Sequence, residues 1–298
     1  MILKCPLVSE ENYIKKNRLL LEDTFLKTKT IDWLGTIGVG DYMMALNTAY
    51  FLSHILNENI RLNFHWTHDI DYLYHDQDPE TIIERLQFIH DRMYKTEKVS
   101  VTHEFNTKDL WLQIFKWRGI RDPKKRNPCS INGFNTWKFD DKYFRETDPN
   151  KVVIWTPFEN KEKTKKWKYS FQDSHWNMIK DHYLRKHEYD VVELTYRTPI
   201  QEAFDHISTC NFFICYDGMW HYIARNFFKP GIAFGKNSII RSHDPTCHLF
   251  LSPKEHALEE KFNFRRLMRD KDYLETKLHH KSDLFRERFL ECLKLTEQ

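Results

Sequence analysis

Glycine is scarce in this chain of 298 residues, and its placement restricts the folds that the chain can adopt. Six of the eight glycines fall in two clusters, at residues 35–40 and 218–235. A chain this poor in glycine keeps it where the backbone needs a positive φ or where a ligand must come close. Each cluster lies where a strand pattern gives way to a helix pattern. The sequence therefore predicts two α/β halves, each with one glycine-containing turn.

The second half of the chain alternates predicted strands and helices. Apolar runs predict strands at residues 152–155, 191–194, 212–216 and 232–234. Helical patterns separate these strands at residues 173–187, 199–207 and 218–227. Strands joined by helices of this length form a parallel sheet with helices on both faces. Ligands bind such sheets at the carboxyl ends of the strands, where this prediction places Asp217 and Gly235.

The first half of the chain is less regular. Its patterns predict strands at residues 31–34 and 60–66 and helices at residues 9–27, 41–56 and 79–93. Residues 118–150 are polar and rich in turn-forming residues, so we expect a domain boundary near residue 150. The charged, proline-free stretch that follows Lys254 predicts C-terminal helices.

The composition favours a soluble protein of the cytoplasm. Hydrophobic residues make up 41% of the chain, and the formal net charge is only +3. That charge is too balanced to imply nucleic-acid binding by the chain as a whole. The six cysteines form no C-x-x-C pair, which favours a reducing compartment. The sequence shows no signal peptide and no apolar run of the roughly 20 residues that span a membrane.

The first glycine cluster reads Gly35-Thr-Ile-Gly38-Val-Gly40-Asp41. Its G-x-x-G-x-G spacing differs from the dinucleotide fingerprint, and no Gly-Lys-Ser/Thr follows to make a P-loop. The pattern predicts a turn that exposes backbone N–H groups, followed by a helix with a carboxylate in its first turn. Spacing alone favours Asp41 as a residue that caps this helix and complements its dipole.

Two motifs of the second half suit an anionic ligand. Residues 161–168 read Lys-Glu-Lys-Thr-Lys-Lys-Trp-Lys in the loop after a predicted strand. These cations hold a diphosphate at the edge of the sheet, or they form a solvated run of charge. Asp217-Gly-Met-Trp-His221 follows a buried strand and opens a helix, whose N-terminus is an anion site. His221 then faces the ligand, or it is a core histidine.

A third motif, Asp69-Ile-Asp71 after His65 and His68, has the D-x-D form that holds a divalent cation in some sugar-transferring enzymes. Histidine and aspartate pairs at this spacing are weak evidence for a metal without further ligands. We interpret the segment as a solvated loop and expect no metal site.

In chain order, these motifs resemble the bacterial heptosyltransferase family, whose fold is the two-Rossmann glycosyltransferase type called GT-B. The family has Gly-Asp before an apolar helix, Lys-Arg-Trp in a loop, then Asp, Ser or Thr and Gly-x-x-His after a buried strand, and a Phe-Gly strand end. The corresponding segments here are Gly40-Asp41, Lys165-Lys166-Trp167, Asp217-Gly-Met-Trp-His221 and Phe234-Gly235. The chain lacks the Ser or Thr before Gly218, and Asn47 stands where the family has proline.

The resemblance implies an α/β protein whose two Rossmann-like domains face an interdomain cleft. Residues 1–150 would form the acceptor side, and residues 151–298 would bind the nucleotide-sugar and carry the C-terminal helices. The implied reaction is inverting sugar transfer, with Asp41 as the general base for an acceptor hydroxyl. Cations and backbone N–H groups would stabilise the diphosphate in place of a metal, and no cofactor is implied besides the nucleotide-sugar donor. The implied donor-binding residues are Lys165, Lys166, Asp217, Gly218 and His221.

The family precedent points to a saccharide hydroxyl as the acceptor. The segment between residues 111 and 138, however, interleaves tryptophans with cations, which suits phosphates and stacked bases. A hydroxymethylated DNA base, turned out of the duplex, is therefore an alternative acceptor. The other interpretation is that the tryptophans, Trp137 included, are core and the cations, Lys138 included, are solvated. The acceptor-binding candidates are Trp117, Arg118, Arg121 and Lys125.

Two further functions remain open at the level of sequence. One is a non-catalytic module that binds a nucleotide-sugar, which the altered donor motifs would fit. The other is a nucleotide-sugar epimerase on the same fold.

Overall fold

In the computed structural model, the described residues are 28–35, 39–67, 79–94, 98–106, 137–155, 181, 189–195, 197–216, 219–234, 248–251, 279–280, 282–284, 286–287 and 289–290. A few side chains within these ranges, that of Asp41 among them, lie outside the description. Contacts divide the chain into unit 1, formed by Met1–Asp140 with Arg288–Gln298, and unit 2, formed by Asp141–Glu287. The division falls at Asp140, whereas the sequence placed a boundary near residue 150.

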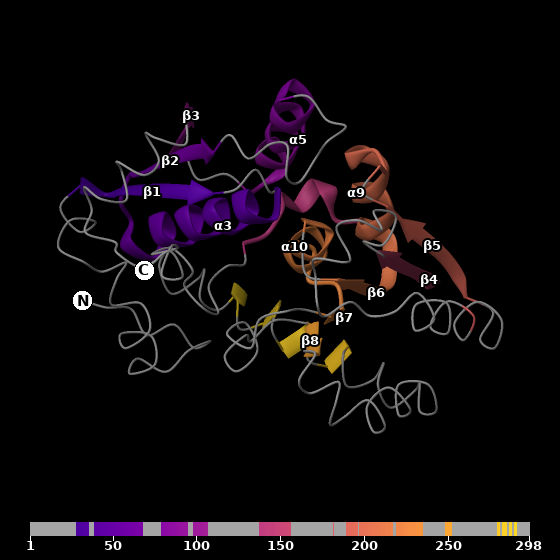
Figure 1. Cartoon of the computed structure of the whole chain (residues 1–298). Helices are drawn as coiled ribbons and strands as arrows, with labels where there is room; N and C mark the ends of the chain where they lie inside the picture. Colours follow the sequence, from indigo (N-terminus) through magenta and orange to yellow (C-terminus); the bar gives the residue numbers. More distant parts are fainter. Residues whose placement is uncertain are drawn as a thin grey trace. The chain divides into compact units, whose positions relative to one another are not determined.

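Unit 1 contains a parallel sheet with the strand order β1-β2-β3. Its strands are β1 (Thr30–Gly35), β2 (Ile60–Thr67) and β3 (Val99–Asn106). Its helices are α3 (Val39–Leu56) after β1 and α5 (Pro79–Arg92) after β2 (Figure 1). The sequence predicted all of these elements except β3. The predicted helix at residues 9–27 lies outside the described residues.

The two faces of the unit 1 sheet differ in polarity. Strands added in one direction place right-handed crossover helices on the same face of a sheet. On that face α3 packs against β2 and α5, and the ring of Tyr42 meets the ring of Phe64 at 5.3 Å. The alternate positions of the strands are polar: Arg61 is exposed, and Thr102 donates a hydrogen bond to Asn63 at 2.8 Å. The core of unit 1 therefore lies between the helices and one face of the sheet.

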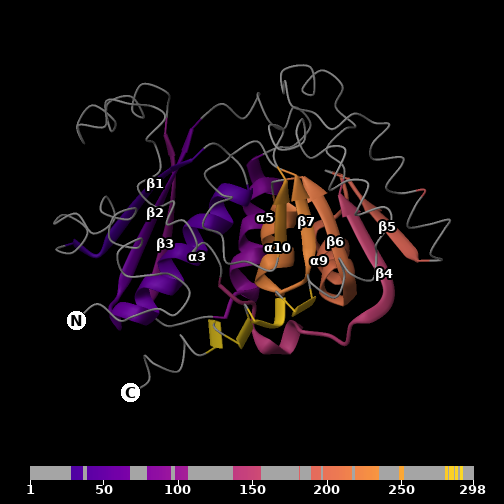
Figure 2. The same ribbon diagram turned by 90° about the horizontal axis from the view of Figure 1, so that it is seen from below.

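Unit 2 contains a parallel sheet with the strand order β5-β4-β6-β7-β8. Its strands are β4 (Asp148–Trp155), β5 (Asp190–Leu194), β6 (Cys210–Tyr216), β7 (Gly231–Phe234) and β8 (His248–Leu251). The helices α9 (Ile200–Thr209) and α10 (Met219–Asn226) lie on the same side of this sheet (Figure 2). The sequence predicted these elements except β8. Both units are thus α/β with parallel sheets.

Two close contacts hold the core of unit 2 together. The rings of Phe204 on α9 and Phe227 after α10 meet edge to face at 4.8 Å. β7 approaches β6 so closely that a Cβ atom at Gly231 would lie 2.2 Å from the carbonyl oxygen of Phe213. Gly231 is therefore required by strand packing, whereas the sequence had grouped it with glycines that approach a ligand.

The chain passes between the units at Asp140 and again at Glu287, and each passage is anchored within both units. In unit 1, the ring of Phe289 meets that of the buried Trp137 at 5.7 Å. In unit 2, Phe144 packs against Phe227 at 5.4 Å, and the hydroxyl of Ser282 donates to the carbonyl of Phe228. Among the described helices, none has both the length and the apolar character that a membrane span needs.

Candidate functional site

The strand order of unit 2 reverses at β4. The chain adds β5 on one side of β4 and then returns to add β6 on the other side. The carboxyl ends of β4 and β6 lie next to each other, since Trp155 pairs in register with Cys215. In open α/β sheets, ligands bind outside the carboxyl ends of the strands at such a reversal. This edge is the candidate site.

The segments that leave β4 and β6 carry the donor residues predicted from the sequence. The first begins at residue 156, and the second consists of residues 217 and 218 before α10 begins at Met219. Topology brings the starting points of both segments to neighbouring strands. The predicted donor residues in these segments, Lys165, Lys166, Asp217 and Gly218, lie outside the described residues, so their roles stay predictions.

His221 lies in the first turn of α10 and is wholly buried. Burial, and secondarily the charge of Arg225, holds the pKa of His221 well below its ordinary value, so the ring is neutral at pH 7. Its ring centroid is 5.1 Å from that of Tyr222, and the guanidinium carbon of Arg225 lies 5.5 Å from the Tyr222 ring. A buried, neutral imidazole fits a core histidine, and contact between His221 and a donor stays a prediction.

In unit 1, Asp41 is the third residue of α3, the helix that follows β1. The next residue, Tyr42, is fully buried, and its hydroxyl lies 3.5 Å from Nε2 of His103 on β3. Burial raises the pKa of Tyr42, with smaller effects from Tyr50 and Asp91, and burial lowers the pKa of His103. A neutral hydroxyl therefore meets a neutral imidazole, and this contact ties the first turn of α3 to β3.

The sequence did not identify His103. Val99, Val101 and His103 alternate with polar residues, which is the signal of a strand with one buried face. His103 stands where that pattern places an inward side chain. A strand prediction at Val99–Asn106 would have directed attention to a histidine among core positions.

Trp137 belongs to the core of unit 1, as the interpretation of these tryptophans as core residues predicts, whereas Lys138 is buried and not solvated. Trp137 is fully buried, stacks on Tyr50 at 6.1 Å, and donates from Nε1 to the carbonyl oxygen of Tyr94 at 2.7 Å. Lys138 is 7% exposed, and its Nζ lies 4.4 Å from the centre of the Tyr94 ring. The remaining acceptor candidates, Trp117, Arg118, Arg121 and Lys125, lie outside the described residues.

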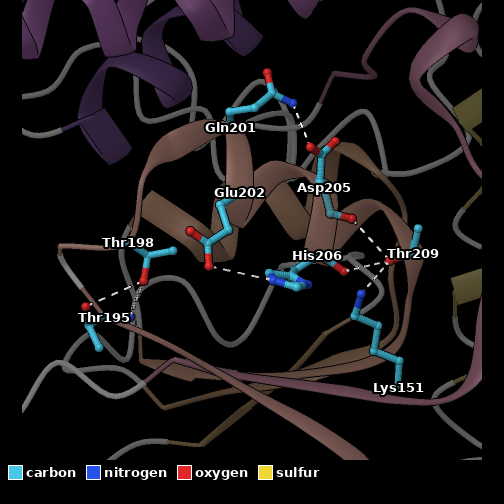
Figure 3. A network of polar contacts seen from close by, with 8 residues as sticks. All are labelled: Lys151, Thr195, Thr198, Gln201, Glu202, Asp205, His206 and Thr209. Carbon is cyan, nitrogen blue, oxygen red and sulfur yellow. Dashed lines mark hydrogen bonds and ion pairs between the residues drawn. The ribbon is translucent and has the colours of Figure 1, made fainter.

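A polar network lies along α9 (Figure 3). Lys151 donates from Nζ to the hydroxyl of Thr209 at 3.0 Å, and that hydroxyl donates to the carbonyl of Asp205 at 3.1 Å. Gln201 donates to the Asp205 carboxylate at 2.8 Å. Thr209 directly precedes β6, so this part of the network lies toward the amino ends of the strands, away from the candidate site. It places a cation at the C-terminus of α9, where the helix dipole favours one.

Within the described residues, no three His, Cys, Asp or Glu side chains are grouped as a metal site would require. The predicted solvated loop with Asp69 and Asp71 lies outside those residues, and so does the side chain of His65.

Neither a family model nor a curated protein matches the chain. Among solved structures, the chain is similar to the bacterial iron-containing dodecameric glycosyltransferase TibC from enterotoxigenic E. coli H10407, at 16% identity and a TM-score of 0.41. The similarity covers 75% of this chain and 62% of the TibC chain, so this chain spans less than two thirds of that structure's length. A function for this chain therefore has to be argued from its own residues.

Proposed function

We propose that the chain is a glycosyltransferase that uses a nucleotide-diphosphate sugar, with the donor at the carboxyl ends of β4 and β6. The observation that supports this proposal most is the reversal of strand order at β4. The N-terminus of α10 follows β6 at this edge, and a helix N-terminus favours a phosphate. Lys165 and Lys166, in the segment after β4, would add the cations that a diphosphate needs.

The proposed reaction is inverting transfer. Asp41 would accept the proton of the acceptor hydroxyl, and the hydroxyl oxygen would then attack the anomeric carbon of the donor sugar. The bond from that carbon to the diphosphate breaks, and the nucleoside diphosphate leaves with the bonding electron pair. Lys165 and the N–H groups at the start of α10 would stabilise the developing charge, so the proposal needs no metal and no further cofactor.

The proposed acceptor is a saccharide hydroxyl. Burial of Trp137 and Lys138 removes one tryptophan and one cation from the surface that favoured a DNA base. Transfer to a hydroxymethylated base in duplex DNA is the alternative outcome of the acceptor test. Binding to duplex DNA that weakens steeply with salt, and that Arg121→Ala weakens further, would favour that base as the acceptor.

The experiment begins with a thermal-shift panel of nucleoside diphosphates and their sugars. A ligand at 100 times its dissociation constant should raise the free energy of unfolding by about 2.7 kcal/mol. Lys165→Ala should weaken this binding. Lys151→Ala is the matched control, because Lys151 lies toward the opposite end of the strands and contacts Thr209.

Product analysis with the donor that binds best then separates the functions. A glycosylated acceptor and a free nucleoside diphosphate support transfer, and Asp41→Asn should abolish transfer with little change in donor affinity. An isomerised nucleotide-sugar would identify an epimerase. Binding with neither product nor slow hydrolysis would identify a binding module. Absence of binding across the panel would contradict the proposal.

A further inference from the structure

Two indole N–H groups at the carboxyl edge of the unit 2 sheet are buried and have no hydrogen-bond acceptor among the residues that the structure describes. Trp155 is the last residue of β4, and Trp220 is the second residue of α10. The Nε1 atom of each is shielded from solvent, and the described part of the chain supplies no acceptor for either. Trp220 as a whole is fully buried.

Trp137, which is buried in the core of unit 1, provides a comparison, because its indole N–H has a hydrogen-bond acceptor within the chain. Its Nε1 donates to the carbonyl oxygen of Tyr94 at 2.7 Å. An indole N–H is a donor with no acceptor function, and leaving it unpaired after burial costs free energy. Native proteins pair most buried donors, so an unpaired one calls for a specific explanation. The other two tryptophans whose side chains are described, Trp155 and Trp220, differ from Trp137 in both pairing and location.

Trp155 lies on one of the two neighbouring strands at the reversal, and Trp220 lies on the helix that follows the other strand. Trp155 ends β4 in register with Cys215 on β6, and Trp220 follows β6 in the first turn of α10. Neutral donors that cannot accept a hydrogen bond match oxygen atoms that carry negative charge. The N-terminus of α10 favours the same kind of group. The position and chemistry of the two indoles thus agree on an anionic ligand with several oxygens.

We propose that Trp155 and Trp220 are ligand-binding residues whose indole N–H groups donate hydrogen bonds to the phosphate oxygens of the nucleotide-sugar donor. This inference rests on the proposed function and adds two residues to its donor site. The bound phosphates supply the acceptors that the described part of the chain lacks. Neither residue takes part in a bond-making step.

Replacement with phenylalanine separates the packing of the aromatic ring from hydrogen bonding by the N–H, because it keeps a ring and removes the N–H. If the N–H serves a ligand, Trp155→Phe and Trp220→Phe remove an unsatisfied donor. The smaller ring leaves a cavity, but no hydrogen bond to the described residues is lost, so the melting temperature of the free protein should fall less than it does when a paired indole is replaced. The affinity for nucleoside diphosphates should fall by roughly tenfold for each variant, as for one lost hydrogen bond to a charged group.

Trp137→Phe is the matched control. It removes an indole N–H that is already paired with the chain, so it should lower the melting temperature and leave the affinity unchanged. Affinity is measured by calorimetry with UDP, GDP, ADP and CDP on the full chain. Nitrogen-15 labelling of the tryptophans gives a second measurement on the unmodified protein. Two indole resonances, assigned through the Phe variants, should move downfield on addition of the nucleotide that binds best.

The outcomes distinguish this inference from the function on which it rests. Equal nucleotide affinity in both variants, with indole resonances that do not move, would overturn the inference and leave the proposed function standing. Absence of nucleoside diphosphate binding by the unmodified protein would overturn both. If Trp220→Phe fails to fold, the resonance of Trp220, identified as the one that persists in single Phe variants of each of the other eight tryptophans, carries the test. Its failure to move on nucleotide binding would then overturn the role of Trp220.

Discussion

Units 1 and 2 both build a parallel sheet, but they order the strands differently. Unit 1 adds β2 and β3 in one direction from β1, whereas unit 2 places β5 and β6 on opposite sides of β4. A sheet that grows in one direction carries its helices on one face and leaves no reversal between its described strands. The edge of a sheet at which a ligand is expected to bind therefore depends on the order of the strands. Two sheets built from similar elements can differ in that order.

Tyr42 and Tyr50 in unit 1 differ from Trp155 and Trp220 in unit 2 in how their polar groups are paired. In unit 1, the hydroxyl of Tyr50 lies 2.9 Å from Nε2 of His90, and Tyr42 reaches His103. In unit 2, the N–H groups of Trp155 and Trp220 find no acceptor among the described residues. The pairs of unit 1 are satisfied by the chain itself and serve stability. The unsatisfied donors of unit 2 support its proposed role in binding a ligand.

The largest effect is expected from Gly231→Ala in unit 2. The new Cβ would lie 2.2 Å from the backbone oxygen of Phe213, so β7 would have to move away from β6. We expect a loss of about 3 kcal/mol or more in the free energy of unfolding, measured with denaturant. Ile232→Val, at a fully buried neighbour, is the control and should cost about 1 kcal/mol. Equal effects of the two variants would show that the close approach of β7 is not required.

The next effect is a loss of stability on acidification, larger in unit 2 than in unit 1. The pKa values of His221 and His103 are lowered in the folded state. Below about pH 6.5 the unfolded chain binds protons that these rings do not, so stability falls as the pH falls. The loss should be larger for His221, which is fully buried and whose pKa is lowered well below its ordinary value, than for the partly buried His103.

Unfolding measured at pH 7, 6 and 5 checks this dependence. His221→Leu should flatten the profile more than His103→Asn does. A profile unchanged by His221→Leu would mean that His221 binds a proton in the folded protein.

A smaller difference in stability is expected between a variant at the paired Tyr50 of unit 1 and a variant at the Trp220 indole of unit 2. Tyr50→Phe removes one partner of a 2.9 Å hydrogen bond and leaves His90 unsatisfied, so it should cost about 1 kcal/mol. Trp220→Phe leaves a cavity but breaks no hydrogen bond to the described residues, so it should cost less than Trp137→Phe, which leaves a similar cavity and also breaks a hydrogen bond. Thermal unfolding of the three variants, each measured against the unmodified chain, provides the comparison. Equal destabilisation by Trp137→Phe and Trp220→Phe would remove the distinction between the units.

The smallest effect is expected at the surface of unit 2. Arg145 and Asp205 form an ion pair at 2.9 Å, with side chains that are 54% and 36% exposed. Arg145→Ala should change the free energy of unfolding by less than about 0.5 kcal/mol, and the change should shrink further in high salt. A change above 1 kcal/mol would indicate that the segment after Asp141 needs this ion pair to pack against α9.

The sequence predicted the elements whose signal is local. The apolar run at residues 212–216 and the glycine-free stretch after Asp41 correspond to β6 and α3. It missed β3, in which a histidine occupies an inward position, and β8, which has only four residues. It left two interpretations of Trp137 open, because a core tryptophan beside lysine has the same pattern as a stacking residue on a basic surface.

Strand order could not be predicted, because it depends on pairing between segments far apart in the chain. Trp155 and Cys215 pair although they lie far apart in the sequence, and no local sequence pattern indicates this pairing. The candidate site depends on this pairing. Glycine, lysine and histidine motifs proposed its segments as candidates, and that stays a prediction, whereas the indoles of Trp155 and Trp220 became noticeable only once their burial was known.

Hydrogen exchange with and without a nucleoside diphosphate tests the central claim most directly, because it reports both units in one experiment. Ligand at the reversal of strand order should slow exchange in peptides that cover the ends of β4 and β6 and the first turn of α10. Peptides that cover the ends of β2 and β3 in unit 1 should exchange at the same rate in both conditions. Protection confined to unit 1, or protection at the amino ends of the unit 2 strands, would contradict the account.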